Sequence, residues 1–268
     1  MATASIESPR AWLGELEARY PWQALVVDGH EWRWLDTARP GPAAVLLPGS
    51  VGDGAMFGRI LLSLGERLRL VAVTYPALSD PHALATGLAA VMDRLRLPRA
   101  TIAGSSFAAY WIQFFALARP ERVHALLVGN GFTDSSDLAG NPLFDRDYVE
   151  SIDAASLHAE WLRRVRAMPP SPLQALQEIM LAERQSPDNL RARFLGVVRA
   201  HACPPLSLAP RAVTILDCDD DPLIPPAARA RLRAGYPGAR HVSLPRGGHY
   251  PHLLDPGEYE KLLVQTMQ

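Results

Sequence analysis

The chain has 268 residues, with 27 basic and 28 acidic side chains and a formal net charge of −1. This length suits one large domain better than two, and the balanced charge gives no basic stripe for nucleic acid. The longest apolar runs are too short to span a bilayer, and the first nine residues lack the pattern of a secretory signal. The two cysteines, Cys203 and Cys218, have no disulfide spacing, so we expect a cytoplasmic protein with reduced thiols.

The first predicted elements are a short helix and a β-hairpin. Ser8-Pro9 is typical of a helix start. Residues 24–27 and 31–35 flank Asp28-Gly29, which predicts two antiparallel strands joined by a two-residue turn. The fully apolar run at 43–47 predicts a strand that is buried on both faces.

Strands and helices alternate in most of the remaining chain. Further strands are predicted at residues 70–74, 100–103, 123–128, 213–216 and 241–244, and helices at 56–64, 81–95, 106–118, 226–234 and through Tyr259 and Leu262. This alternation indicates parallel strands joined by helical crossovers. The sequence therefore predicts an α/β fold with a mostly parallel eight-stranded sheet and helices on both faces.

Residues 133–210 interrupt the alternation, because they have helical periodicity and prolines but no convincing strand. Residues 157–165 and 173–181 predict two amphipathic helices, separated by Met168-Pro169-Pro170. The segment follows a strand at the end of the sheet where such folds bind ligands. We therefore expect a helical lid within a single domain of residues 1–268, with a plain helical insertion at the sheet edge as the alternative.

The segment Gly104-Ser105-Ser106-Phe107-Ala108 lies between a predicted strand and a predicted helix. Its Gly-x-Ser-x-Ala spacing is one methyl group away from the G-x-S-x-G nucleophile elbow. Small residues on both sides of Ser106 allow the backbone to pass close to itself, and the helix N-terminus favours a developing negative charge. We predict Ser106 as the nucleophile, with Ser105 or a plain helix cap as alternatives.

A serine hydroxyl needs a base that takes its proton and a group that orients this base. His249 follows two glycines after the last predicted strand and is the candidate base, with His252 as the local alternative. Asp221 precedes a proline and a helix and is the candidate acid, with Asp220 and Asp134 as alternatives.

Two further features complete the predicted site. The acidic run at 217–221 lacks the alternate spacing and the glycine of a calcium loop, so we expect no metal. The backbone N–H groups of Phe107 and Ser50 are the candidate oxyanion donors. Apolar residues expected in the pocket wall are Val51, Phe107, Phe132, Trp161, Met180 and Leu223.

Several segments carry a family resemblance. They are Tyr75-Pro76, Gly104-Ser105-Ser106-Phe107-Ala108-Ala109, residues 125–135, and residues 236–240 leading into Gly247-Gly248-His249. Through them the chain resembles the α/β-hydrolase superfamily over nearly its whole length, and within it maspardin-like proteins. The serine–acid–histidine order is also that of this superfamily. The resemblance implies a triad of Ser106, Asp221 and His249, with Phe107 and Ser50 as oxyanion amides.

The resemblance has two departures, because Ala108 replaces the usual glycine and Pro48-Gly49 stands where many members have His-Gly. The maspardin branch also includes members that lack an intact triad and act as adaptor or binding proteins. With all three residues present, we expect a cofactor-free serine hydrolase that cleaves an ester or thioester of a small apolar substrate. Cyclisation, acyl transfer and a non-catalytic binding role are the alternatives, and a homodimer is left open.

Overall fold

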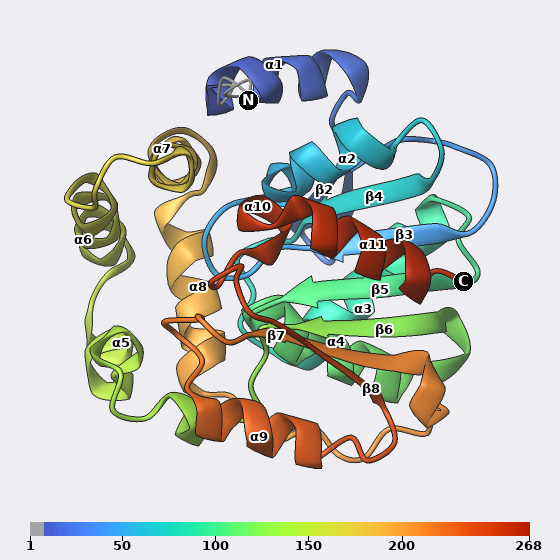
Figure 1. Ribbon diagram of the computed structural model, residues 1–268. Helices are drawn as coiled ribbons and strands as arrows, with labels where there is room; N and C mark the ends of the chain where they lie inside the picture. Colours follow the sequence, from blue (N-terminus) through green and yellow to red (C-terminus); the bar gives the residue numbers. More distant parts are fainter. Residues whose placement is uncertain (1–7) are drawn as a thin grey trace.

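The computed structural model of the protein describes residues 8–268, in which eight strands form one sheet (Figure 1). The strands are β1 (Gln23–Val27), β2 (His30–Asp36), β3 (Ala43–Leu47), β4 (Arg69–Thr74), β5 (Ala100–Ser105), β6 (Val123–Gly129), β7 (Val213–Cys218) and β8 (Arg240–Leu244). Their order in the sheet is β1-β2-β4-β3-β5-β6-β7-β8. β1–β2 and β2–β4 pair antiparallel and all other neighbours pair parallel. The predicted sheet is confirmed.

The hairpin at the start of the sheet forms at the predicted turn. Val27 pairs with His30, so Asp28 and Gly29 alone connect β1 to β2. Both have positive φ, 50° at Asp28 and 79° at Gly29, as the twist of a two-residue hairpin requires. The expectation about a secretory signal rests mainly on residues 1–7, which lie outside the described residues.

Helices cover both faces of the sheet, as predicted (Figure 1). On one face lie α1 (Pro9–Arg19), α2 (Gly58–Leu64) and α11 (Pro256–Thr266), which follows the short α10 (Pro251–Leu254). On the other lie α3 (Pro81–Arg94), α4 (Phe107–Ala118) and α9 (Pro226–Ala234). Alternate residues of β3 supply the two cores, since Ala44 and Leu46 join the first and Val45 and Leu47 the second.

Between β6 and β7 the chain forms a helical insertion, residues 133–210, in which the described residues contain no strand. Its helices are α5 (Arg146–Ser151), α6 (Ala154–Arg166), α7 (Pro172–Ile179) and α8 (Pro187–Val198), with a π-helical turn at Met180–Arg184 after α7. The two predicted helices correspond to α6 and α7, and the Met168-Pro169-Pro170 break lies between them. The sequence did not predict α8, because the buried Arg193 interrupts its apolar face.

The insertion has a small apolar core of its own, which packs onto the loop after β3. Seven of its residues are buried together with Val51 of that loop: Val149, Leu157, Val165, Leu181, Leu190, Phe194 and Val198. The insertion therefore touches the part of the sheet edge where the predicted site lies. None of the helices within residues 8–268 combines the length and apolar character needed to cross a membrane.

Candidate active site

Ser106 lies at a sharp corner between β5 and α4. Its backbone is in a left-handed conformation, with φ 55° and ψ −119°, which costs a non-glycine residue on the order of 1–3 kcal/mol. Its N–H donates to the carbonyl of Gly129, 2.9 Å away, and so ties the corner to β6. A Cβ at Gly104 would lie 2.7 Å from the backbone of Ala108, and one at Gly49 would lie 2.9 Å from the Ser106 Cβ. The predicted strand–turn–helix is confirmed, and small residues are required around it.

The carboxylate of Asp221 binds the imidazole of His249. Nδ1 of His249 lies 2.9 Å from Oδ2 and 3.1 Å from Oδ1 of Asp221. The Asp221 side chain is fully buried and also accepts the N–H groups of Leu223 and Ile224, at 2.8 and 3.2 Å. Burial alone would raise the pKa of Asp221, but the hydrogen bonds from His249 and its other donors outweigh burial and lower it. Asp221 is therefore ionised, and it orients the His249 ring.

Asn130 completes this arrangement, and the sequence did not predict its role. It follows β6 with φ 47°, a conformation that asparagine tolerates. Its Nδ2 donates to Asp221 Oδ2 at 2.6 Å and to the carbonyl of Gly248 at 2.9 Å. One side chain thus joins the acid loop to the histidine loop. An Asn-Gly pair directly after an apolar strand was the only local signal for it.

The alternative acids have other partners. Asp220 accepts the N–H of Gly248 at 2.8 Å, so it supports the histidine loop without touching the imidazole. Asp134 pairs with Arg231, and hydrogen bonding to that guanidinium lowers its pKa to about 2. Asp217 pairs with Arg233. Asp217, Asp220 and Asp221 of the acidic run therefore each bind a different partner. Within residues 8–268, no group of three His, Cys, Asp or Glu side chains is placed to hold a metal ion.

The alternative base and nucleophiles are also placed elsewhere. His252 is 2% exposed and stacks on Phe57, with ring centroids 4.4 Å apart. Ser105 is the last residue of β5 and does not line the cavity that holds Ser106. Burial raises the pKa of both Cys203 and Cys218 to about 12, so neither thiol is activated as a nucleophile.

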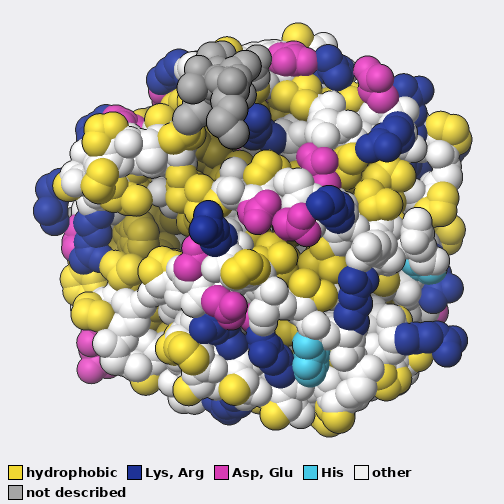
Figure 2. Space-filling view, in the orientation of Figure 1, with side chains coloured by type: hydrophobic (Ala, Val, Ile, Leu, Met, Phe, Trp, Pro, Cys, Tyr) yellow, Lys and Arg dark blue, Asp and Glu magenta, His cyan; other side chains and the backbone are white. Residues whose placement is uncertain are grey.

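Ser106 and His249 line the same cavity, whose volume is about 440 Å³. The insertion forms much of its wall, and Figure 2 has a hollow with hydrophobic sides where Figure 1 shows α6, α7 and α8. Of the apolar residues predicted in the wall, Val51, Trp161 and Leu223 line the cavity, and so does Ser50, which was predicted as an oxyanion donor. Within the described part of the chain, the Ser106 hydroxyl and His249 are not joined by a hydrogen bond.

Two of the apolar residues predicted in the wall lie elsewhere. Phe132 is 1% exposed and stacks on Tyr110 in the core beneath the site, with ring centroids 5.3 Å apart. Met180 is fully buried in the other core, near Gly52. A third residue expected in the wall, Phe107, is also fully buried in the core. As the first residue of α4 it has an N–H without an intrahelical acceptor.

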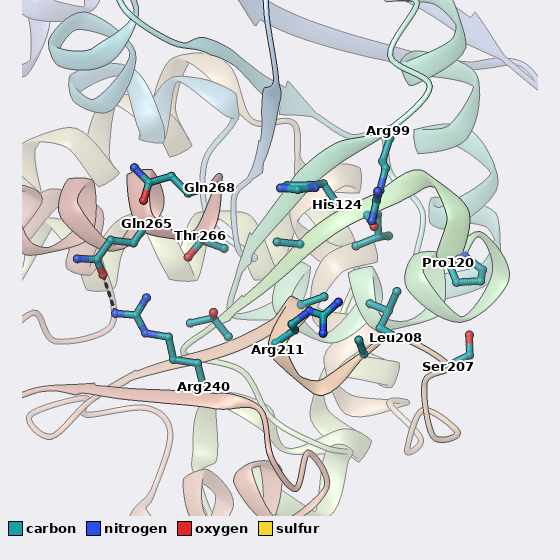
Figure 3. Close-up of a pocket in the computed structure, with 15 residues that line it drawn as sticks. Arg99, Pro120, His124, Ser207, Leu208, Arg211, Arg240, Gln265, Thr266 and Gln268 are labelled. Carbon is teal, nitrogen blue, oxygen red and sulfur yellow. Dashed lines mark hydrogen bonds between the residues drawn. The ribbon is translucent and has the colours of Figure 1, made fainter.

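A second cavity, of about 500 Å³, lies at the opposite edge of the sheet, where β5 to β8 begin (Figure 3). Arg99, Arg211, Arg240 and His124 stand around it, and Arg240 is bonded to Gln265. No Asp or Glu side chain is among the described residues that line it. It lacks an acid–histidine pair, so the cavity at Ser106 is the candidate active site.

The chain is similar to several known proteins. The alpha/beta hydrolase family matches the chain over residues 44–262. Maspardin from Homo sapiens is 25% identical over 249 residues, covering 89% of this chain and 80% of that protein. The same fold occurs in a thermophilic esterase from Thermogutta terrifontis (TM-score 0.73, 19% identity, 91% and 97% of the two chains). It also occurs in the enol-lactonase from Burkholderia xenovorans LB400 (TM-score 0.72, 15% identity, 91% and 99%). The chain belongs to the alpha/beta hydrolase family.

Proposed function

We propose that the protein is a serine hydrolase that cleaves an ester or thioester of a small apolar substrate. The observation that carries this proposal is the buried Asp221–His249 pair, which shares a cavity with Ser106 at its left-handed corner. Two proteins of the same fold are named as an esterase and an enol-lactonase, which agrees with the proposal.

In the proposed acylation step, Ser106 Oγ attacks the substrate carbonyl while His249 Nε2 takes the hydroxyl proton. The new Oγ–C bond turns the carbonyl oxygen into an oxyanion. When this intermediate collapses, the bond to the alcohol or thiol breaks, and the leaving group receives the proton from His249. Asp221 holds the Nδ1–H tautomer, which leaves Nε2 free to act as the base.

In the second step, water takes the place of the leaving group. His249 removes one proton from the water, the hydroxide adds to the acyl carbon, and Ser106 leaves with the proton restored. The carboxylic acid is released and the enzyme is regenerated without a cofactor. The N–H groups of Phe107 and Ser50 are the proposed donors to the oxyanion in both steps.

The cavity wall supports an apolar substrate. Residues of the insertion in the wall include Phe144, Trp161, Val165, Leu173 and Phe194. Such a surface binds acyl chains mainly through the hydrophobic effect. We therefore propose that the insertion acts as a lid and sets the choice of acyl group.

The experiment that tests this proposal is labelling with a fluorophosphonate probe, which reacts with activated serines. We expect the wild-type protein and Ser105→Ala to take the label and Ser106→Ala to take none, since Ser106 lines the cavity with His249 and Ser105 does not. A panel of p-nitrophenyl esters and acyl thioesters of increasing chain length then defines the substrate class.

Two outcomes would contradict the proposal. Labelling that persists in Ser106→Ala and disappears in Ser105→Ala would identify Ser105 as the nucleophile. A folded wild-type protein that takes no label would favour a non-catalytic binding role. Products other than the free acid and alcohol would instead indicate acyl transfer or cyclisation in the same cavity.

A further inference from the structure

Arg193 of α8 is fully buried beneath the loop that follows β3. Its Nη1 donates to the carbonyls of Gly49, at 2.9 Å, and Gly52, at 2.7 Å. Its Nη2 donates to the carbonyl of Tyr75 at 3.2 Å. Within residues 8–268 no carboxylate forms an ion pair with it, since the nearby Asp53 pairs with Arg184 instead. Burying an arginine without a counter-charge is unfavourable, so its contacts with this loop need an explanation.

The loop at residues 48–53, here called the oxyanion loop, is also held by the side chain of Tyr75. The Tyr75 hydroxyl lies 2.8 Å from the carbonyl of Pro48 and 2.9 Å from that of Gly49. The ring of Tyr75 lies under the Arg193 guanidinium, with the centroid 3.9 Å from Cζ, a favourable cation–π geometry. The Gly49 carbonyl therefore accepts from both side chains.

These contacts fix the direction of the Ser50 N–H. The Gly49 carbonyl and the Ser50 N–H belong to one planar trans peptide unit, so they point in opposite directions. Donors that hold the carbonyl on the Arg193 side thus turn the N–H toward the other side. Gly49 packs directly against Ser106, since a Cβ on it would lie 2.9 Å from the Ser106 Cβ. The positively charged guanidinium of Arg193, which donates to the Gly49 carbonyl, also polarises this peptide unit and strengthens its N–H as a donor.

The insertion holds the rest of the oxyanion loop in the same way. Gln185 accepts the N–H of Gly52 at 2.8 Å and donates to the carbonyl of Ser50 at 2.8 Å. Asn189 donates to the Tyr75 carbonyl at 2.9 Å and accepts from Gln185 at 3.0 Å. Gln185, Asn189 and Arg193 are spaced four residues apart and form one polar row on the insertion.

We infer that Arg193 is a positioning residue of the insertion, which orients the oxyanion loop so that the Ser50 N–H can bind the oxyanion formed at Ser106. This inference rests on the proposed function. It makes the insertion a fixed part of the catalytic structure, because moving it off the site would break the hydrogen bonds of Arg193 and Gln185.

The test compares Arg193→Met and Arg193→Lys with the wild-type protein. The matched control is Arg191→Met on the same helix, whose arginine donates to the carbonyls of Ile152 and Glu150, away from the oxyanion loop. Each variant is assayed with a p-nitrophenyl ester for kcat and KM. Its affinity is also measured for a trifluoromethyl ketone, which forms an oxyanion on the serine, and for the matching secondary alcohol, which does not.

Loss of one oxyanion donor lowers kcat by about 10²- to 10³-fold. We expect Arg193→Met to lower kcat by about 100-fold while KM changes by about twofold or less. Affinity for the ketone should weaken by a similar factor and affinity for the alcohol should stay the same. Arg193→Lys should recover part of the loss, since it restores a cation with hydrogen-bond donors. Arg191→Met should keep the wild-type values.

The outcomes separate this inference from the proposed function. If the wild-type protein takes no fluorophosphonate label, the proposed function fails and the role of Arg193 fails with it. If the wild-type protein reacts but Arg193→Met weakens ketone and alcohol equally, or leaves kcat unchanged, the role of Arg193 alone is overturned. Should Arg193→Met not fold, Tyr75→Phe takes its place, because it removes only the hydroxyl at Pro48 and Gly49 and should lower the ketone affinity selectively.

Discussion

The two sides of the cavity are held in different ways. On one side, the acid–base loops (residues 219–223 and 247–250) are joined by Asn130, which stands at the end of a core strand. On the other side, the oxyanion loop is held by Gln185 and Arg193 of the insertion. Ser106 lies between them on the corner that leaves β5.

This difference separates two parts of the proposed chemistry. Proton transfer depends on contacts that the sheet and its strand ends provide. Oxyanion binding depends on contacts that reach across from the insertion, more than 130 positions further along the chain. Changes in the insertion should therefore alter both substrate choice and transition-state binding, and leave the acid–histidine pair in place.

Among the variants that separate the two sides of the cavity, Asp221→Asn is expected to have the largest effect on kcat. The new amide oxygen would keep the N–H groups of Leu223 and Ile224, so its NH₂ group would face Asn130 and His249. Nδ1 of His249 would then have to accept, which places the proton on Nε2, where it cannot take one from Ser106. We expect kcat to fall by about 10⁴-fold, measured with a p-nitrophenyl ester.

Asp220→Asn is the matched control for this experiment. Asp220 lies in the same loop and lines the cavity, but it accepts the Gly248 N–H and does not touch the imidazole. The substituted amide can accept the same N–H, so we expect less than about a tenfold loss. If Asp220→Asn were inactive and Asp221→Asn active, Asp220 would be the acid of the triad.

A smaller effect is expected for Asn130→Gly. Glycine keeps the positive φ of this position and removes the two hydrogen bonds to Asp221 and the Gly248 carbonyl. A hydrogen bond to a charged group contributes roughly 1.5–3 kcal/mol, which corresponds to about a tenfold or greater loss of kcat/KM. The same fall should occur in the rate of fluorophosphonate labelling.

The pH profile of Asn130→Gly checks the reason for that loss. Removing a donor to the Asp221 carboxylate raises the pKa of this group toward its ordinary value, because the charged form loses stabilisation. The acid limb of kcat/KM should therefore move to higher pH. An unchanged limb with unchanged activity would mean that Asn130 serves the fold alone.

The core of the site could be predicted because its signals are local. The small residues around Ser106, the acid before a proline and the glycines before His249 each lie within a few positions of the residue they serve. The same holds for the sheet, whose strands alternate with helices at regular spacing. The local sequence alone therefore indicates Ser106, Asp221 and His249 as the candidate triad.

The supporting residues could not be predicted because their partners are distant in sequence. Asn130 meets Asp221 across 91 positions, and Arg193 meets Gly49 across 144. An arginine in a helix ordinarily indicates an exposed face, so its burial is visible only in the folded chain.

The apolar wall was predicted only in part for a related reason. Trp161 and Phe132 are both large apolar residues near the expected site, yet Trp161 lines the cavity and Phe132 packs below it. Hydrophobicity predicts burial but does not say whether the buried surface faces a cavity or the core. Met180 shows the same limit, since a π-helical turn begins there and the residue is fully buried.

The smallest expected effect on activity is that of His252→Phe. His252 directly follows the acid–base loops, and its ring stacks on Phe57 at the end of the 3₁₀ helix (Gly54–Phe57) that follows the oxyanion loop. It thus lies where the two sides of the site meet. His252 does not line the cavity, so we expect kcat to change by less than about threefold. An inactive His252→Phe variant would instead make His252 a candidate for the catalytic base.

The effect of His252→Phe on stability should depend on pH. Burial, with a smaller contribution from the nearby His249, lowers the pKa of His252 to about 3. Both ring nitrogens lack partners among the described residues. Because the folded pKa lies below the unfolded value of about 6.5, the unfolded chain binds the proton first as the pH falls. The wild-type free energy of unfolding should therefore drop by up to about 1.4 kcal/mol per pH unit below 6.5 from this group alone.

Phenylalanine keeps the stacking on Phe57 and cannot take up a proton. Urea unfolding at about pH 7, 6 and 5 should therefore give a stability gain over the wild-type protein that widens toward acid. His30→Asn on the exposed start of β2 is the control, and its unfolding should follow the wild-type curve. A constant gap at all three pH values would mean that His252 binds its proton equally well in the folded and the unfolded chain, so that its burial does not disfavour the charged ring.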